Sequence, residues 1–269
     1  MPTPPRLRLS QGQLNLLQTC PRKFQHVYLD QMAAPPSPDE QARLTWGSRF
    51  HLLMQQRELG LPTHAFSSET DALQANVETL QATVSERLKA SPTEAQNQFR
   101  QSEYRLSLNF QDYLLTVIYD LLIIGPADAA IFDWKTYAQP PQRAWLKDNW
   151  QTRLYPFVLT EVMGIDPASV SLTYWFIPPG GSDAQPLQSM RFDYDASQHE
   201  AIRAELTQLL QQLTAWLEDY QEGVPLPQIP PGARCESCQF NQRCDRHPDS
   251  SDPPRPTLPQ PSEIEEVVL

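Results

Sequence analysis

The sequence predicts a mixed α/β fold in which helices pack against one central sheet. Three observations lead to this expectation. Three segments with strand-like alternation follow one another in the middle of the chain, a further apolar strand comes after a helix, and long segments with helical periodicity lie on both sides of this block. Strands and helices mixed in this order are typical of one sheet covered by helices.

The predicted helices are recognised by the helical spacing of their apolar residues. The first is short, and Ser10 is suited to cap it because its hydroxyl can accept a hydrogen bond from a free backbone N–H group. The fourth is expected to end at Gly164, since glycine adopts the left-handed conformation readily. The predicted helical segments are residues 10–19, 39–59, 68–90, 143–163 and 196–222.

The predicted strands either alternate apolar and polar residues or are short apolar runs between turn residues. Residues 109–112 are expected to form the turn between the first two strands, and Gly125-Pro126 ends the second. Two proline-containing stretches, residues 33–38 and 224–232, are expected to be connectors. The predicted strands are residues 104–110, 113–124, 129–134 and 169–177, with a candidate fifth at 187–194.

The length of 269 residues fits one sizeable domain. We expect residues 1–247 to form it, and residues 248–269, rich in proline, serine and acidic residues, to be a disordered tail. No apolar run approaches the roughly 20 residues of a membrane span, and the N-terminus does not resemble a signal peptide, so we expect a cytoplasmic protein without a membrane partner. Because the net charge is −11, a nucleic-acid partner would require a local basic groove and bound cations.

Two aspartates and a lysine lie within or at the end of adjacent predicted strands. Asp120 interrupts an otherwise apolar strand, where an ionised carboxylate is costly unless it is paired or bound to a cation. Asp133 and Lys135 end the next strand and share one face of it, with Trp134 on the other. The set is either an ordinary ion pair at a strand end or a site where carboxylates hold a divalent cation.

The second interpretation matches the needs of phosphodiester hydrolysis. Two carboxylates can hold one or two divalent cations, which polarise a phosphoryl oxygen and lower the pKa of a bound water. A neighbouring ammonium stabilises the charge that develops on the phosphate. Oxygen ligands favour Mg²⁺ or Mn²⁺.

Several motifs give this set a resemblance to a known family. Asp120 followed by Asp133-Trp134-Lys135 resembles the core motif of the PD-(D/E)XK nuclease superfamily, in particular its RecB-like branch. The resemblance covers about residues 9–247. The other segments that resemble motifs of this branch, in the same order along the chain, are Leu9 to Phe24, Gly47 to His51, Phe132 to Thr136 and Gln151 to Tyr155.

The resemblance implies a restriction-endonuclease-like fold, a mixed sheet flanked by helices, and a hydrolase that depends on a divalent cation. It implies that Asp120, Asp133 and Lys135 are catalytic, and that His51 joins the two aspartates as a ligand of Mg²⁺ or Mn²⁺. A neutral imidazole suits Mn²⁺ better than Mg²⁺. Gln151 and Tyr155, which share a helical face, are expected to lie along bound DNA, and packing of that face on the sheet is the alternative.

The chain departs from the family pattern at two positions. No glycine directly precedes Asp120, and the second acid is Asp133 instead of the commoner glutamate. Asp128 is a rival for the first acid, but it falls in the predicted turn after Gly125-Pro126. Glu103, which precedes the first predicted strand, is interpreted as a solvated acid at a strand end in preference to a third metal-linked carboxylate.

The chain has only four cysteines, and we do not expect disulfides in a cytoplasmic protein. Three of them follow the spacing C-x2-C-x5-C, and thiolates so placed bind iron–sulfur clusters or Zn²⁺. One cysteine near the N-terminus with three near the C-terminus resembles the iron staple of AddB-type helicase–nucleases and CRISPR-adaptation exonucleases. The resemblance implies a [4Fe–4S] cluster on Cys20, Cys235, Cys238 and Cys244, and the alternative is zinc on the last three with His247.

The expected function is metal-dependent cleavage of DNA, on single strands or strand ends, in repair, recombination or CRISPR adaptation. The sequence contains no phosphate-binding G-x-x-x-x-G-K motif, so a helicase or CRISPR partner would be another chain. Trp145 and Trp150 could stack on bases, although packing in the core is the expectation. Two other functions stay open, a non-catalytic nucleic-acid-binding module of the same fold and a zinc-binding structural protein.

Overall fold

The computed structural model describes residues 7–33, 35–61, 82, 99–136, 139–178 and 187–246. These residues belong to two compact units, Met1–Pro227 and Gln228–Leu269. Most of the predicted helix at 68–90, residue His247 and the predicted tail at 248–269 lie outside the described residues. The predicted division of the chain at residue 247 therefore stays a prediction.

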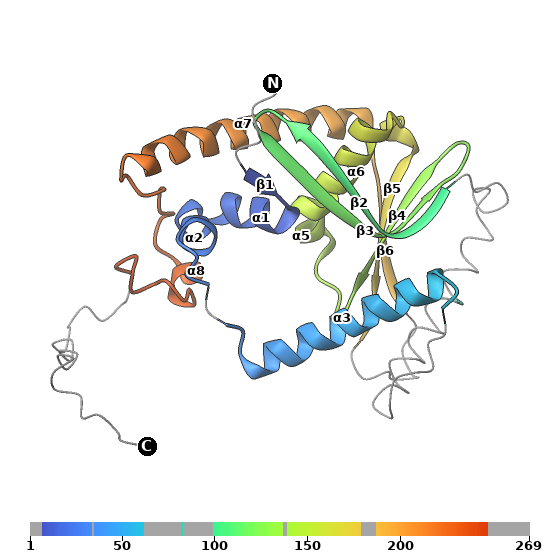
Figure 1. The fold of residues 1–269 in the computed structure, drawn as a ribbon, viewed down its shortest axis with the longest axis horizontal. Helices are drawn as coiled ribbons and strands as arrows, with labels where there is room; N and C mark the ends of the chain where they lie inside the picture. Colours follow the sequence, from blue (N-terminus) through green and yellow to red (C-terminus); the bar gives the residue numbers. More distant parts are fainter. Residues whose placement is uncertain are drawn as a thin grey trace, which may run out of the picture. The chain divides into compact units, whose positions relative to one another are not determined.

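Six strands of the first unit form one mixed sheet, which confirms the predicted fold class (Figure 1). Their order is β1-β3-β4-β5-β6, and β2 also pairs with β3. The pairs β1–β3 and β4–β5 are parallel, and the other pairs are antiparallel. The strands are β1 (Leu7–Leu9), β2 (Phe99–Phe110), β3 (Tyr113–Ile124), β4 (Ala129–Lys135), β5 (Val170–Phe176) and β6 (Gln188–Asp193).

Strand β3 is the centre of this sheet, and one of its edges is divided between two partners. β2 pairs with β3 from Phe110↔Tyr113 to Phe99↔Ile124, so it occupies one edge over the whole length. The other edge pairs with β1 up to Leu9↔Leu115 and with β4 only from Leu121↔Phe132 onward. Within the described part of the chain, residues 116–120 of β3 therefore have no strand partner on this edge.

The helices α1 (Gln11–Thr19), α3 (Pro38–Glu58) and α7 (Ala196–Gln221) agree with the predicted segments, whereas the segment at 143–163 differs. The predicted helix at 143–163 is divided at Asn149, whose side chain accepts a hydrogen bond from the N–H group of Gln151 and so caps a new helix. Gly164 ends that helix in the left-handed conformation, with φ 67°, as predicted. Strand β1 and the residues from Pro21 to Leu29 were not predicted as regular structure, because such short segments show no periodicity.

The helices of the first unit are α1 (Gln11–Thr19), α2 (Pro21–Phe24), the π-helix η1 (Gln25–Leu29), α3 (Pro38–Glu58), α5 (Arg143–Asp148), α6 (Trp150–Met163), the 3₁₀ helix η4 (Pro167–Ser169) and α7 (Ala196–Gln221). The second unit contains α8 (Ala233–Glu236), and Arg246 donates to the carbonyl of Ile229 within it. Among the described helices, none has the length and apolar character needed to cross a membrane.

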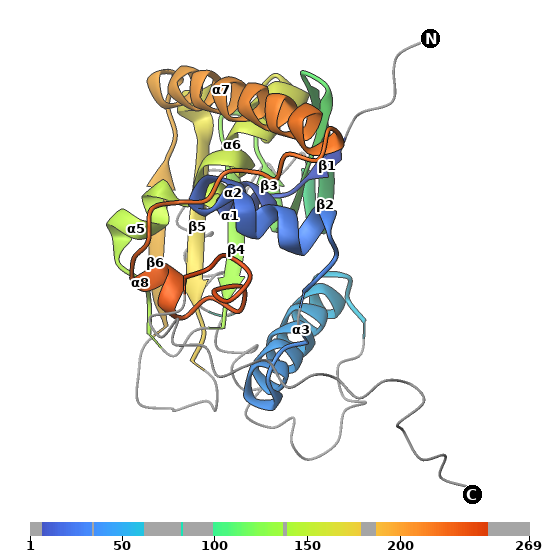
Figure 2. The same cartoon turned by 90° about the vertical axis from the view of Figure 1, so that its left-hand side faces the viewer.

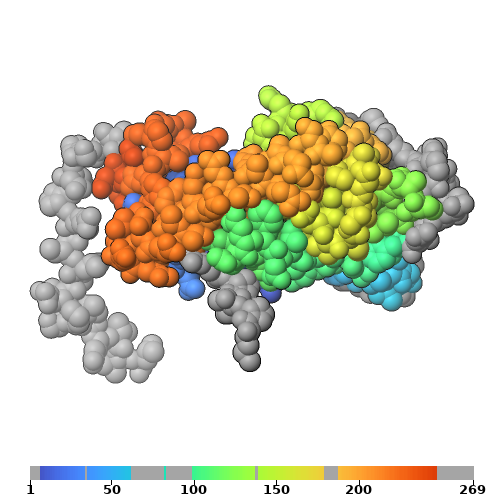
Figure 3. Space-filling view, turned by 90° about the horizontal axis from the view of Figure 1, so that it is seen from above, coloured from blue at the N-terminus to red at the C-terminus, as the bar shows by residue number. Residues whose placement is uncertain are grey.

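Helices cover both faces of the sheet with separate apolar cores (Figures 1 and 2). The larger core joins α1, α6 and α7 to the sheet, and α7 forms a continuous ridge beside the β2–β3 hairpin (Figure 3). The smaller core joins α3 to the opposite face, where Phe50 and Leu53 pack with Leu121 and Trp134. Burying each such side chain contributes roughly 1.5–3 kcal/mol. The two faces thus position α3 and α6 on either side of β3 and β4.

A buried polar cluster anchors the π-helix to the end of α7. Tyr220 of α7 donates to Asp30 Oδ1 at 2.6 Å, and His26 and Gln25 approach Asp30 Oδ2 at 2.9 and 3.2 Å. Burial alone would raise the pKa of Asp30, but the hydrogen bonds from Tyr220, His26 and Gln25 outweigh it and lower this pKa below its ordinary value of 3.8. The ionised carboxylate is therefore favoured by folding.

We predict that Asp30→Asn destabilises the protein by roughly 1–3 kcal/mol at pH 7, because hydrogen bonds to a charged acceptor are lost. Since folding lowers the pKa of Asp30, its contribution is complete above the unfolded value and disappears as the pH falls through the lower folded value. Urea unfolding from pH 7 to pH 3 measures this. Tyr220→Phe should show a smaller effect with the same pH dependence, and a pH-independent difference for Asp30→Asn would contradict the assignment.

Candidate active site

The site begins where β3 and β4 separate. Leu121↔Phe132 is the last paired position, so the N–H and C=O groups of Trp134 lose a strand partner on the β3 side. The carboxylate of Asp120 replaces that partner, since its Oδ2 accepts the N–H group of Trp134 at 2.7 Å. Asp120 is only 9% exposed. This bond fixes a carboxylate in the gap between the two strands.

His51 reaches the same gap from α3 on the other face. Its Nε2 lies 3.1 Å from the carbonyl oxygen of Trp134, and its Nδ1 lies 3.3 Å from Asp120 Oδ1. Because a carbonyl oxygen can only accept, Nε2 carries a proton, and a neutral His51 directs the lone pair of Nδ1 toward the carboxylate. Gly47, one helical turn earlier, permits this approach, since a Cβ atom there would lie 3.1 Å from Oγ1 of Thr136.

Glu103 is the residue that the sequence interpretation underrated. It lies inside β2, not before it, and its side chain is 32% exposed. Its Oε1 lies 3.9 Å from His51 Nδ1, and one ligand atom each of His51, Glu103 and Asp120 lie within 4.8 Å of one another. The expected position before the first strand was wrong, because β2 begins at Phe99 and extends further than its alternating pattern.

Asp133 and Lys135 lie on the face of β4 that α6 covers, opposite to Trp134. Asp133 is 2% exposed. Its Oδ2 lies 2.6 Å from Lys135 Nζ, and its Oδ1 accepts from Gln151 Nε2 at 2.5 Å. Asp128, the rival for the first acid, lies in the β3–β4 turn, where its carbonyl accepts from Gly125. The turn is at the opposite end of β4 from Asp133, so Asp128 cannot join this constellation.

Gln151 and Tyr155 occupy the face of α6 that looks onto the site. Tyr155 is 3% exposed and packs edge-on against Tyr119 at 5.3 Å between ring centroids, and its carbonyl accepts from the Tyr119 hydroxyl. Gln151 is half-buried. Contact of these two side chains with DNA stays a prediction.

Electrostatics show that the site is short of positive charge. Burial alone would lower the pKa of His51, but Asp120 and Glu103 outweigh it and raise this pKa to about 10. Burial raises the pKa of Asp133 to about 6 against the opposing effect of Lys135, and the charge of Asp120 adds to the rise. Burial also raises the pKa of Tyr155, with smaller contributions from Asp133 and Asp120. A cation between these carboxylates would relieve their repulsion.

The donors present fit a hard divalent cation. His51 offers one imidazole nitrogen, and Asp120 and Glu103 offer carboxylate oxygens, at mutual distances that one ion could bridge after small movements. A mixed oxygen and imidazole set suits Mn²⁺, and Mg²⁺ accepts the oxygens. Asp133 lies beside this group and is already neutralised by Lys135.

None of the four cysteines forms a disulfide, and all four are half-buried. Among the described residues, no group of three or more His, Cys, Asp or Glu ligands that could share one ion includes a cysteine. Cys20 Sγ accepts the N–H group of Lys23 at 3.4 Å and caps α2. The iron–sulfur cluster stays a prediction, and His247 of the alternative zinc site lies outside the described residues.

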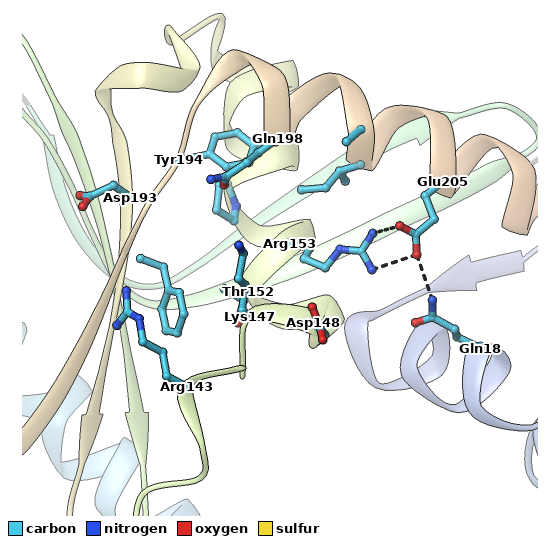
Figure 4. A pocket seen from close by; sticks show the side chains of 14 residues that line it. Gln18, Arg143, Lys147, Asp148, Thr152, Arg153, Asp193, Tyr194, Gln198 and Glu205 are labelled. Carbon is cyan, nitrogen blue, oxygen red and sulfur yellow. Dashed lines mark hydrogen bonds and ion pairs between the residues drawn. The ribbon is translucent and has the colours of Figure 1, made fainter. Parts of the chain in front are cut away.

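A pocket of about 720 Å³ lies between α5, α6, β6 and α7 (Figure 4). Arg153 is paired there with Glu205, which also accepts from Gln18. Three basic and three acidic side chains line it, so it has no net charge to attract an anion: Arg143, Lys147, Arg153, Asp148, Asp193 and Glu205. None of its lining residues belongs to the constellation around Trp134.

A mixed sheet with acids and a lysine on adjacent central strands, flanked by helices, is a restriction-endonuclease-like fold. The model of the PD-(D/E)XK nuclease superfamily matches residues 8–245, so the chain belongs to this superfamily. The match spans every motif that carried the resemblance.

Solved structures agree with this assignment. A candidate exonuclease from Eubacterium rectale aligns with a TM-score of 0.51 at 13% identity, over 92% of this chain and 90% of that chain. LHK-Exo in complex with dAMP aligns with a TM-score of 0.37 at 12% identity, over 80% of this chain and 92% of that chain. The first likeness supports the fold, and the second is too distant to carry an argument. No curated protein sequence matches the chain.

We predict that Lys135→Met destabilises the metal-free protein more at high pH than at low pH. The pKa of Asp133 is already raised to about 6, so its ionised form costs stability as the pH rises from its unfolded value through that range. Removing Lys135 raises the pKa of Asp133 further, so the loss of stability on ionisation continues to higher pH. We expect the variant to lose roughly 1–3 kcal/mol more at pH 8 than at pH 5 in urea unfolding without added cations. An equal loss at both values would argue against the ion pair.

Proposed function

We propose that this protein is a divalent-cation-dependent nuclease that hydrolyses phosphodiester bonds of DNA, on single strands or at strand ends. The observation that carries the proposal is the convergence of Asp120 and His51 on the backbone of Trp134, with Asp133 and Lys135 directly beside it. An ordinary ion pair between Asp133 and Lys135 would not require Asp120 and His51 to converge on this peptide. Membership of a nuclease superfamily agrees with it.

We assign His51, Asp120 and Asp133 as ligands of Mg²⁺ or Mn²⁺. When bound, such a cation polarises the phosphoryl oxygen and lowers the pKa of a water. Asp120 is held in place by the Trp134 N–H group and His51 by the Trp134 carbonyl, so both side chains are oriented before any substrate arrives. The ligands therefore lose little freedom on binding the ion.

Lys135 is assigned the role of stabilising the negative charge that grows on the phosphate. Its ammonium lies against Asp133 and 5.5 Å from the centre of the Tyr174 ring, which limits its movement. Gln151 orients Asp133 through its amide. We propose that Gln151 and Tyr155 also lie along the bound strand, with Gln151 nearer to it because Tyr155 is buried.

Trp145 supports a single-stranded substrate. The expectation that it packs in the core was wrong, because it is 56% exposed on α5, whereas Trp150 is fully buried. Trp145 lies only a few residues before Gln151 in the chain. An exposed tryptophan is suited to stack on an unpaired base. The name of the candidate exonuclease with the same fold agrees with action at strand ends.

We predict that Asp133→Asn and Lys135→Ala each reduce cleavage by about a hundredfold or more, because each loses a charge that acts on the reacting phosphate. The measurement is Mn²⁺-dependent digestion of single strands labelled at either end, with protein purified anaerobically. Binding of the same strands should remain measurable in both variants. Glu200→Gln, which removes a charge from the exposed side of α7, is the control.

If both variants cut as fast as the unmodified protein, the nuclease proposal is wrong. Strand binding without cleavage in the unmodified protein would favour a non-catalytic module of the same fold. Neither binding nor cleavage, with zinc present, would favour a structural zinc protein.

We also propose that Cys20, Cys235, Cys238 and Cys244 hold a [4Fe–4S] cluster, on the basis of their number, spacing and lack of disulfides. Contacts within the first unit favour this, because Arg22, just after Cys20, binds Leu226 and Pro227 near the start of the cysteine-bearing segment. A helicase or CRISPR protein on another chain is the partner that this arrangement suggests. Such a staple would act on stability, not on the hydrolytic step.

We predict that anaerobically purified protein is brown, absorbs near ~400 nm and contains iron. Cys20→Ser should remove the colour and the iron. Colourless protein that contains zinc, and retains it in Cys20→Ser, would show instead that the three C-terminal cysteines bind zinc without Cys20.

A further inference from the structure

One carboxylate beside the site has no role in the proposed function. Glu103 is contributed by β2, a strand on the far side of β3 from β4. We propose that Glu103 is a ligand of the same divalent cation as His51 and Asp120, so that the metal centre draws on β2 as well as on α3 and β3. This inference rests on the proposed function and extends its ligand set.

The distances favour a shared ion. Ligands in adjacent positions around an ion bound at 2.0–2.2 Å lie about 3 Å apart, and those in opposite positions about 4 Å apart. The 3.3 Å from His51 Nδ1 to Asp120 Oδ1 and the 3.9 Å from His51 Nδ1 to Glu103 Oε1 fall within this range. All three ligand atoms lie within 4.8 Å of one another, so only small side-chain movements separate them from a common ion.

The Nδ1 atom of His51 points toward the same position between the two carboxylates. The Nε2 atom is held by the Trp134 carbonyl, so Nδ1 faces Asp120 and Glu103. Three acceptor atoms converge there when the imidazole is neutral, whereas a proton on Nδ1 would donate to the two carboxylates. Such an arrangement is stable only with a positive charge among them.

The backbone of β2 is irregular at Glu103. Glu103 has φ 50°, in the left-handed region that a non-glycine residue rarely enters within a strand. Its neighbours pair normally, as Ser102↔Leu121 and Tyr104↔Tyr119, whereas a pair between Glu103 and Asp120 is missing from the ladder. In a regular antiparallel ladder these two residues would lie directly opposite each other, with both side chains on the same face of the sheet. The interruption of the β2–β3 ladder therefore lies at the positions of Glu103 and Asp120.

Asp133 has different surroundings. Both of its oxygens are engaged, one by Lys135 and one by Gln151, and it faces α6. Among the described residues, Glu103 pairs with no cationic side chain other than His51. Glu103 can therefore move toward an ion at a lower cost than Asp133, which would first have to leave Lys135.

The test measures Mn²⁺ binding directly, by the loss of the free-ion electron paramagnetic resonance signal during titration of the metal-free full-length protein. We expect Glu103→Gln to weaken Mn²⁺ binding by tenfold or more, since loss of even an indirect partner of a ligand costs about 10–100-fold. Asp120→Asn should weaken it at least as much. Glu200→Gln, which removes the same charge elsewhere, should bind Mn²⁺ like the unmodified protein.

Glu103→Asp guards against a general effect of the irregular backbone, because it keeps the charge and the chain position. It should bind Mn²⁺ more tightly than Glu103→Gln. If Asp120→Asn weakens binding but Glu103→Gln matches the control, Glu103 is not a ligand and the proposed function stands. If neither variant changes binding, the metal centre itself is wrong. If Glu103→Gln slows cleavage without changing Mn²⁺ binding, Glu103 acts on the substrate and the ligand assignment is overturned.

Discussion

The backbone of Trp134 is the constraint on which the site depends. β3 pairs with β1 at one end and with β4 at the other. The peptide groups of Trp134 therefore lie where β3 and β4 no longer pair. Buried peptide groups must find partners, and here the partners are the side chains of Asp120 and His51. A requirement of folding thus orients two chemically active groups. The indole of Trp134, buried in the core beneath α3, holds this peptide in place.

The same separation of strands lets side chains reach the site from both faces of the sheet. α3 brings His51 from one face, whereas α6 brings Gln151 to Asp133 from the other. Each helix is held by its own apolar core, so the polar groups between them need not contribute to packing. The carboxylates repel one another at this point, and Lys135 together with a protonated His51 offsets the repulsion only in part. The arrangement of these charges therefore favours a cation at the site.

Much of the fold was predictable because the segments are long. β3, β4 and α7 each carry enough residues for their periodicity to be unambiguous, and Gly164 and Ser10 mark helix ends by their own chemistry. The short β1 and the π-helix carry no such signal, since they form only against β3 and α7. The break at Asn149 was missed because an apolar stripe continues across it. Among the site residues, Glu103 was misjudged because the pairing with β3, and not the pattern of β2, decides where that strand begins.

The sequence by itself determined which groups are available: two aspartates and a lysine at strand positions, a histidine on a helix, and four cysteines, one early and three late in the chain. It also determined the class of fold, because the periodicity of strands and helices follows from the order of apolar and polar residues. Only the tertiary structure decided which groups meet. The distances between His51, Glu103 and Asp120 depend on the division of the β3 edge and on an irregular residue in β2, which arise from contacts between segments far apart in the chain. No local pattern encodes such contacts, because they form only when the sheet is assembled.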